Sequence, residues 1–429
     1  MFTTNLSDSG RPAAAFDFAS INLEAIARET SFIKYDTPGF SAEGFLLALL
    51  KAVCDGRGSL RELCNSMGNR EDKALSREGL NYRFSPEGLI FLERILGEII
   101  AAISHDTHGT ASGSFERILI EDATQIRLHP GNAKWFKGVR NQAGWTSTVK
   151  FDAITDLLSG ELLPTLMTDG KNQDKVNGQR IFDVLKPNDL VLRDLGYWGV
   201  NALDKISEAG AWWISRLHGL CKVWTPGGKT LEECLANSDK DLVELDVEIT
   251  EQRFKARLVA VRASEEVAGQ RRAKAKAHRK KMGSTPSKQA LLREGWTIMV
   301  TNLSSQQMSA REVVDTYWLR WAVEIRFRAL KGSSNLRNLL SRRRNEAGLR
   351  ILLTAALIYA HLSAKAFVWH KRNQGNGVYL SIEKVSSWVA SMILATKFIG
   401  DCYYYDIRQL VHETRIRKSQ EEILESMNF

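Results

Sequence analysis

Two short apolar runs that each end in an aspartate place the strongest limit on how this chain can fold. Residues 117–122 read Arg-Ile-Leu-Ile-Glu-Asp, and residues 189–194 read Asp-Leu-Val-Leu-Arg-Asp. Apolar runs of this length are typical of buried strands. Further elements are expected around them, with strands at 146–154, 161–167 and 211–217 and helices at 174–185 and 200–209. Three strands followed by alternating strands and helices predict an α/β fold with a mixed sheet and helices packed on it.

The part of the chain before these strands is predicted to be helical. A Ser-x-x-Glu capping box begins at Ser59, and short helices are expected at 59–66 and 76–83. Two such helices suit a helix-turn-helix reader of a DNA groove, with Arg77 and Asn81 as candidate contacts. A small helical bundle without DNA contacts is an equal interpretation.

The second half of the chain interrupts the alternation of strands and helices in the core and then resumes it. Alternating segments predict a β-hairpin, and a strongly basic run follows the hairpin as part of an insertion. A strand and a long helix then resume the core, and the remainder is predicted to be helical apart from a Gly/Asn turn. The ranges are 241–249 and 254–262 for the hairpin, 270–281 for the basic run, 296–302 for the strand, 309–331 for the helix and 373–377 for the turn.

One face of the long helix carries polar groups that a core would not use. At about 100° per residue, four side chains fall within about 60° of one another on the helix; they are Tyr317, Arg320, Glu324 and Lys331. Taken alone, this stripe is also what a solvated face with ion pairs looks like.

Two carboxylates at strand ends change that interpretation. Asp122 and Asp194, together with Glu324, would offer the hard oxygen ligands that a pair of Mg²⁺ ions requires. Two metal ions of this kind activate a nucleophile and stabilise a leaving oxygen at phosphorus. Cations beside the glutamate would hold phosphates.

Composition restricts the class of partner and the compartment. Lys and Arg number 59 against 50 for Asp and Glu, a formal charge of +9 that favours nucleic acid or an anionic membrane surface. The five cysteines are scattered without a CxxC pair, which excludes a zinc site or disulfide framework of known spacing and suits a reducing cytosol. No signal peptide is visible, and the most apolar segment, 351–364, falls short of the ~20 residues of a membrane span. We therefore expect a soluble, cytoplasmic protein with no membrane partner.

Three motifs together resemble a known family. Asp122 in Ile-Glu-Asp-Ala-Thr, Asp194 in Arg-Asp-Leu-Gly-Tyr-Trp, and the Tyr-(2)-Arg-(3)-Glu-(6)-Lys spacing from 317 to 331 look like the signature of the IS4 family of insertion-sequence transposases, relatives of the Tn5 and Tn10 enzymes. The four-residue spacing is specific, whereas Asp-x-Gly-Tyr alone is weak. The resemblance covers at least residues 115–340.

The resemblance implies an RNase H-like catalytic core interrupted by a β-rich insertion. It further implies Mg²⁺-dependent cleavage at terminal inverted repeats, with Mn²⁺ able to substitute, and strand transfer into target DNA, by cut-and-paste through a hairpin intermediate. A homodimer in a synaptic complex is expected, associated with the nucleoid when bound to DNA. The three carboxylates carry over as catalytic metal ligands, and contacts to the terminal phosphates carry over to Tyr317, Arg320 and Lys331. Asp122 rests mainly on its place at a strand end, and Glu121 beside it is the nearest alternative.

Two other residues are weaker candidates for DNA contacts. Trp296 precedes Glu324 by 28 residues (324 − 296), a spacing similar to that of the tryptophan that stacks on a flipped base in the Tn5 enzyme. A strand-initiating core tryptophan is the competing interpretation. Arg216 would face DNA or form an ordinary salt bridge. The basic run predicts salt-sensitive phosphate affinity, unless it is a surface helix without a partner.

The predicted organisation has three parts. These are a helical DNA-binding region at 1–112, an RNase H-like core at 113–219 and 296–340 with a β-rich insertion at 220–295, and a helical C-terminal region at 341–429. Two alternative functions stay open: an inactive or repurposed DNA-binding protein derived from a transposase, and an RNase H-fold nuclease without strand transfer.

Overall fold

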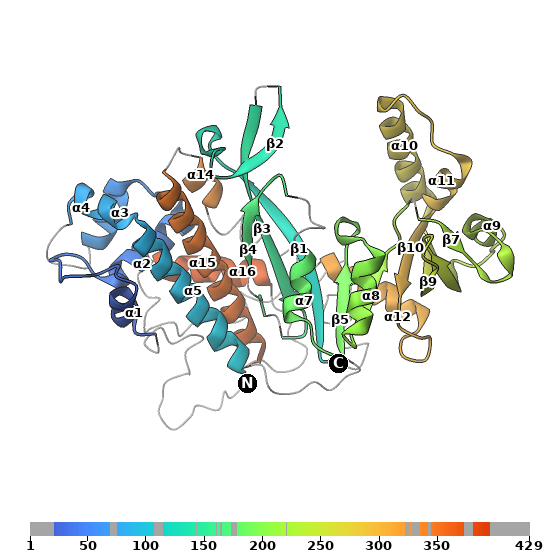
Figure 1. The fold of residues 1–429 in the computed structure, drawn as a ribbon, viewed down its shortest axis with the longest axis horizontal. Coiled ribbons are helices and arrows are strands. Elements are labelled where there is room, and N and C mark those ends of the chain that lie inside the picture. Colours follow the sequence, from blue (N-terminus) through green and yellow to red (C-terminus); the bar gives the residue numbers. More distant parts are fainter. Residues whose placement is uncertain are drawn as a thin grey trace, which may run out of the picture.

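The fold was analysed in a computed structural model of the chain (Figure 1). It describes residues 21–68, 75–106, 115–142, 144–159, 161–163, 165–172, 178–219, 221–321, 327, 335–341, 345–372 and 381–394. A helical body at one end of the molecule packs against a long twisted sheet, and a second group of short helices lies at the other end (Figure 1).

The sheet has ten strands in the order β2-β3-β1-β5-β6-β10-β9-β8-β7, with β4 also paired to β3. β1 is antiparallel to β3 and parallel to β5, and β5 is parallel to β6. The order β4-β3-β1-β5-β6 with these directions is the RNase H-like arrangement. The bounds are β1 Arg117–Arg127, β2 Lys137–Asn141, β3 Gly144–Asp156, β4 Leu166–Asp169, β5 Asp189–Arg193, β6 Trp212–Arg216, β7 Val223–Trp224, β8 Leu242–Ile249, β9 Phe254–Arg262 and β10 Trp296–Thr301.

The strands differ from their expected bounds in two places. β1 does not end at Asp122 but runs on to Arg127, because β3 is long enough to pair with it along that stretch. The expected strand at 161–167 is reduced to an isolated bridge at Leu162, and β4 begins only at Leu166. In both cases the pairing partner, rather than the local apolar pattern, decides the boundary.

The predicted hairpin of the insertion forms as β8 and β9, but it is continuous with the core sheet. β9 pairs with β10, and β10 pairs with β6 at the edge of the core. The basic run lies in α10, Glu265–Lys281, which begins at the side-chain cap Ser264 and buries only Ala268. Short helices α9, Leu231–Ala236, and α11, Lys288–Arg293, flank this end of the sheet (Figure 1).

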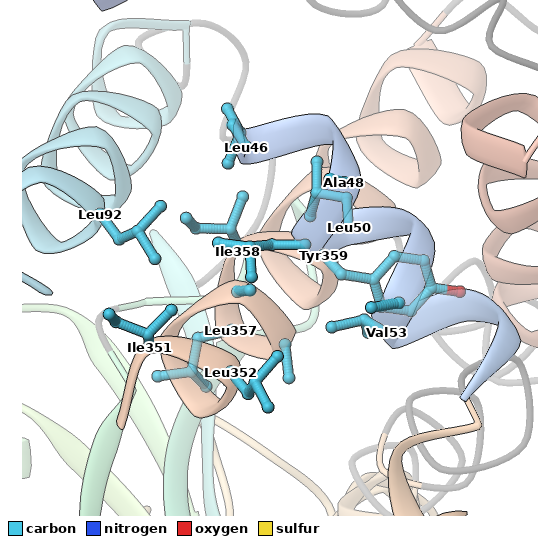
Figure 2. Packing of buried hydrophobic residues seen from close by; sticks show 14 of the residues in the cluster. Leu46, Ala48, Leu50, Val53, Leu92, Ile351, Leu352, Leu357, Ile358 and Tyr359 are labelled. Atoms are coloured by element: carbon cyan, nitrogen blue, oxygen red, sulfur yellow. The ribbon is translucent and has the colours of Figure 1, made fainter. Parts of the chain in front are cut away.

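The helical body joins the two ends of the chain in one hydrophobic core. Its elements are α1 Leu23–Glu29, α2 Ala42–Asp55, α3 Leu60–Gly68, α4 Arg77–Arg83, α5 Pro86–Asp106, α14 Leu336–Leu340, α15 Glu346–Arg372 and α16 Ile382–Leu394. Figure 2 shows Leu46 and Val53 of α2 and Leu92 of α5 around Ile358 of α15. Since Phe151 of β3 belongs to the same cluster, the body is packed onto the sheet.

α15 has the length and composition of a membrane span, yet 89% of its most apolar window is buried inside the protein. Tyr359 in this helix is fully buried and donates its hydroxyl to the backbone oxygen of Ser386 in α16 at 2.8 Å. This is the environment of a core helix, which agrees with the expectation drawn from segment 351–364. The predicted turn at 373–377 lies outside the described residues.

Each face of the core sheet carries its own hydrophobic cluster. Ile118 and Ile120 of β1 with Leu190 and Leu192 of β5 pack on one face, under α12, Ala310–Trp318. On the opposite face Leu119 and Val191 pack under α7, Ile181–Val184, and α8, Val200–Glu208, with their side chains Ile181, Leu203 and Ile206. We call these the α12 face and the α8 face.

The predicted long helix begins at the expected position, with Ser309 as its N-cap. Ser309 and Glu312 form a capping box at its start, each side chain bonding the other residue's backbone N–H. The α-helical geometry ends at Trp318, and a 3₁₀ turn, η6, continues over Leu319–Trp321. Of the rest of the predicted helix the structure describes only Phe327.

Candidate active site

The two candidate aspartates lie side by side on neighbouring parallel strands. In the register of β1 with β5, Ile120 is opposite Leu192, so two residues further along each strand Asp122 comes opposite Asp194. Side chains alternate along a strand, which places both aspartates on the same side as Ile120 and Leu192, the α12 face. The parallel pairing ends two residues earlier, at Ile120 and Leu192, β5 ends at Arg193, and both aspartate side chains are only partly buried. Two carboxylates therefore meet at the carboxyl edge of the parallel strands.

Helix α12 and the turn η6 bring two of the predicted phosphate contacts to the same edge. The Tyr317 hydroxyl donates to the backbone oxygen of Arg193 at 3.3 Å, immediately before Asp194. The Nε atom of Arg320 lies 3.7 Å from Oδ1 of Asp194, and the Arg320 side chain is only 13% exposed. The two described members of the stripe, Tyr317 and Arg320, therefore do not form a solvated face, because they pack against the end of β5 and Asp194.

The electrostatic surroundings of Tyr317 confirm how closely these groups are gathered. Burial, the dominant cause, raises the pKa of the Tyr317 hydroxyl to about 12. The Asp194 charge also raises that pKa, whereas Arg320 and Arg216 lower it. At neutral pH the hydroxyl thus keeps its proton and acts as a hydrogen-bond donor.

Glu324 and Lys331 lie outside the described residues, and of their neighbours in sequence the structure describes Arg320 and Phe327. Arg320 lies beside Asp194. Phe327 packs on the α12-face cluster and also on Ala153, which is the strand partner of Asp122. Within the described residues alone, no group of three carboxylate, histidine or cysteine side chains is arranged to hold a metal ion.

Glu121, the carboxylate next to Asp122 in sequence, is directed to the other side of the sheet. It is 2% exposed and accepts a hydrogen bond from Nη2 of Arg193 at 2.9 Å on the α8 face. Burial raises the pKa of Glu121 to about 7, although the Arg193 guanidinium favours the charged form. This ion pair was not predicted from the sequence. The alternation of side chains along β1 and β5 could have indicated it, because Glu121 and Arg193 each directly precede one of the two aspartates.

Arg216 lies on the α12 face, as Ile214 two residues earlier does. Its charge acts on Tyr317, and together with burial it lowers the pKa of Arg271 in α10. Arg271 donates to the backbone oxygen of Trp296 at 3.4 Å and to Oγ1 of Thr297 at 3.2 Å. Positive charge from three separate elements therefore surrounds the carboxyl edge.

Trp296 is placed differently from the base-stacking hypothesis. Its side chain is 4% exposed and belongs to the cluster of the α8 face, on the side away from the two aspartates. The Arg262 guanidinium lies 4.4 Å from the centre of its ring. This geometry favours the core interpretation.

The N-terminal candidates lie far from this site in the fold. Arg77 and Asn81 are both exposed on α4, and the boundaries of α3 and α4 agree with the two short helices expected there. α4 begins at the cap Ser76, whose hydroxyl accepts from the backbone N–H of Gly79. The surface of α4 is available to a partner.

Comparison with known proteins identifies the family. The sequence pattern of the transposase DDE domain matches residues 113–360, which is more than half of the chain and spans both aspartates and position 324. The chain belongs to this family. It is a DNA transposase by that membership, and DDE domains use divalent metal ions.

Two curated relatives agree with this assignment. The transposase for insertion sequence element IS231C of Bacillus thuringiensis subsp. berliner is 29% identical over 333 residues, covering 72% of this chain and 70% of that protein. The transposase for IS1151 of Clostridium perfringens is 22% identical over 344 residues, covering 74% and 72%. A solved piggyBac transposase synaptic complex with hairpin DNA superposes with a TM-score of 0.41 at 9% identity over 87% of this chain and 76% of that one, a likeness too distant for comparing sites.

Proposed function

We propose that this transposase uses Asp122, Asp194 and Glu324 as its catalytic carboxylates. The observation that supports this most directly is the strand register, which sets two aspartates side by side on the α12 face. Two described neighbours of position 324 in sequence support Glu324 as the third member, because Arg320 lies beside Asp194 and Phe327 lies beside Ala153, the strand partner of Asp122. Carboxylate oxygens are the hard, negatively charged ligands that divalent cations such as Mg²⁺ prefer, which fits three carboxylates at these positions.

The donor set fits Mg²⁺, with Mn²⁺ able to substitute, because it consists of hard oxygen ligands at an accessible edge. When bound, the ions would lower the pKa of the attacking water or 3′-hydroxyl and stabilise charge on the leaving oxygen. The aspartates would hold these ions from two rigid strands. Their partial burial leaves room for a phosphate on the open side.

The chain's own cations and hydroxyl would position the DNA. Arg320 is fixed beside Asp194, so its guanidinium can contact a phosphate held at the carboxylates. Tyr317, protonated at neutral pH, can donate to the same phosphate group. Lys331 is proposed as a further contact from its spacing, and Arg216 adds positive charge at the same edge.

The finer assignments belong to the same proposal. We place the chain in the IS4 family, acting at terminal inverted repeats by cut-and-paste through a hairpin, as a homodimer in a synaptic complex. A cytoplasmic location with nucleoid association on DNA follows from that role. The division at residues 112, 219, 295 and 340 is retained, with the N-terminal helices, including Arg77 and Asn81, as a DNA-binding surface. Trp296 is retained only as a core residue behind the site.

The test is cleavage of DNA by the full-length protein. With Mg²⁺ and duplexes carrying the inverted repeats that border its gene, wild type is expected to nick the ends and join them to target DNA. Asp194→Asn should reduce nicking by at least about a thousandfold while DNA binding persists, since an amide is a much poorer metal ligand. Asp183→Asn, an exposed aspartate of α7, is the matched control and should cleave normally.

Three results would overturn parts of the proposal. Normal nicking by Asp194→Asn would remove Asp194 from the site. Binding without nicking by wild type would identify a repurposed DNA-binding protein. Nicking without joining of pre-cleaved ends would identify a nuclease.

A further inference from the structure

The β2–β3 hairpin forms a two-stranded ribbon that projects from the carboxyl edge of the sheet. β1 last pairs with β3 at Thr148 and β4 last pairs at Val149, so the segment of β3 before them pairs with β2 alone. Figure 1 shows the ribbon rising beyond the rest of the sheet, on the same side as α10. An isolated two-stranded hairpin is only marginally stable, so its long continuation into the sheet holds it in place.

The ribbon carries an exposed tryptophan surrounded by cations. Trp145 is 43% exposed, and its strand partner is Arg140. Three positive groups lie within 6 Å of the ring centre, at 5.8 Å for Nζ of Lys137, 5.9 Å for Cζ of Arg140 and 5.6 Å for Nζ of Lys171. Val139, 68% exposed, adds a second apolar side chain.

The described residues neutralise these charges only in part. Within the described residues, Lys137 and Arg140 form no ion pair, and only Lys171 has a carboxylate neighbour, Asp169 at 3.8 Å. A flat apolar ring with uncompensated cations around it is the combination that binds sugar and base surfaces together with phosphates. Because the chain belongs to a family of DNA transposases, DNA is the polyanion that these groups are placed to meet.

Backbone packing holds the tryptophan rigidly. A Cβ on Gly138 would lie 2.4 Å from Oγ1 of Thr146, so glycine permits the close approach of the two strands there. The Thr146 hydroxyl donates to the backbone oxygen of Val139 at 2.8 Å. The backbone N–H of Lys171 donates to the oxygen of Lys137 at 3.0 Å, which fixes two of the cations relative to each other.

The strand register gives the distance from this cluster to the catalytic carboxylates. Ala153 of β3 is opposite Asp122, and Trp145 precedes Ala153 by eight residues (153 − 145). At about 3.3 Å per residue the separation is about 26 Å, in the direction in which β1 runs beyond Asp122. With a rise of about 3.4 Å per base pair, duplex DNA held at the carboxylates would reach the ribbon after about eight base pairs.

We propose that the β2–β3 ribbon is a second DNA contact, which binds the duplex about eight base pairs from the cleaved phosphate. Lys137, Arg140 and Lys171 hold backbone phosphates, and Trp145 lies against the sugars or base edges of a groove. A two-stranded ribbon has the width that a DNA groove accepts. The location of this contact rests on the proposed function, but its existence does not.

Binding measurements with the full-length protein test the proposal. The probes are fluorescein-labelled duplexes of about 30 and about 10 base pairs with the cleavage site bordering the gene at their centre, so that only the long duplex extends the roughly eight base pairs needed to reach the ribbon. Wild type should bind the long duplex much more tightly, and Trp145→Ala should lose about tenfold or more of that affinity. On the short duplex the two proteins should bind equally.

Charge is tested separately. Replacing Lys137, Arg140 and Lys171 by Gln should reduce the slope of log K against log salt by up to about 3 on the long duplex. Trp145→Phe keeps an aromatic ring and should retain most of the affinity, which separates a lost contact from a misfolded ribbon. Leu394→Ala removes a 44% exposed apolar side chain at the end of α16, outside the proposed DNA contacts, and is the matched control.

The outcomes are distinguishable from those of the proposed function. Wild-type affinity for the long duplex in Trp145→Ala and in the triple variant would overturn the ribbon proposal, even if nicking is normal. A wild type that never nicks would overturn the carboxylate proposal, while the length-dependent binding by Trp145 would still be measurable.

Discussion

The buried ion pair behind the catalytic edge leads to a prediction about stability and pH. Glu121 has a pKa of about 7 in the folded protein, against 4.5 as its ordinary value, because it is buried. Between these two values the folded protein binds more protons than the unfolded chain. The free energy of unfolding therefore falls as the pH rises through this window. The stabilising contribution is complete below pH 4.5 and is lost above pH 7.

The size of this loss in unfolding free energy follows from the pKa shift of Glu121. One pKa unit corresponds to about 1.36 kcal/mol, so a rise from 4.5 to about 7 corresponds to a loss of about 3 kcal/mol between the two pH limits. Glu121→Gln removes the titrating group, and its unfolding free energy should not show this decline. Gln also leaves Arg193 buried with a weaker partner, which shifts the variant's stability by a similar amount at every pH.

Urea unfolding of wild type and Glu121→Gln at half-unit steps from pH 4.5 to 8 measures the effect. The difference between the two unfolding free energies should change by about 3 kcal/mol across the series, to the disadvantage of wild type at high pH. Leu119→Ala, buried on the same face of β1, has no titrating group and should lower stability equally at all pH values. Parallel curves for wild type and Glu121→Gln would refute the assignment of a raised pKa to this carboxyl.

Three further changes test other parts of the fold and the site. Tyr317→Phe keeps the ring buried and removes the bond to Arg193, so unfolding should cost only about 1 kcal/mol less in a urea titration, while nicking of element ends falls at least about tenfold. Ser309→Ala removes the capping box of α12 and should cost about 1 kcal/mol, read as a lower urea midpoint. Burial lowers the pKa of His361 to about 4, so stability is lost as the pH falls below about 6.5; His361→Leu should abolish that loss in acid titrations followed by circular dichroism.

Local chemistry predicted the elements whose boundaries depend on a few neighbouring residues. Ser309 marks the first turn of α12 and Ser59 caps α3, because a capping hydroxyl bonds to a backbone N–H only three residues away. The hairpin of β8 and β9 was also predicted within a residue, since its alternation is carried by its own sequence. Such features need no long-range information.

The extension of β1 and the position of Trp296 depend on partners far away in the chain. Nothing in the mixed polar segment after Asp122 indicates a strand, and it is extended because β3 pairs with it up to Arg127. Trp296 was consistent with either a core or a base-stacking role. Its assignment to the α8 face depends on how β10 pairs with β6 and β9, and local sequence cannot reveal that pairing.

From the sequence alone, the choice between Glu121 and Asp122 as the candidate metal ligand depends on one unknown, which is the face of the sheet that carries the site. Strand alternation alone states that these neighbours face opposite sides of the sheet. Which side carries the proposed chemistry depends on the packing of α12 and the turn η6, whose Tyr317 and Arg320 respectively meet Arg193 and Asp194. Once these two elements are placed, Asp122 is the carboxylate on their side of the sheet and is therefore the one proposed as a ligand.

Because side chains alternate along the strands, the Glu121–Arg193 ion pair also helps to align the two aspartates. Glu121 pairs with Arg193 on one face, and the next residue of each strand is the aspartate on the other. A slip of one residue between β1 and β5 would turn side chains to the wrong face and separate the aspartates. It would also leave a buried arginine without its carboxylate, which costs about 3–5 kcal/mol. The buried pair therefore penalises the misaligned register, and through the register it holds the two catalytic candidates opposite each other.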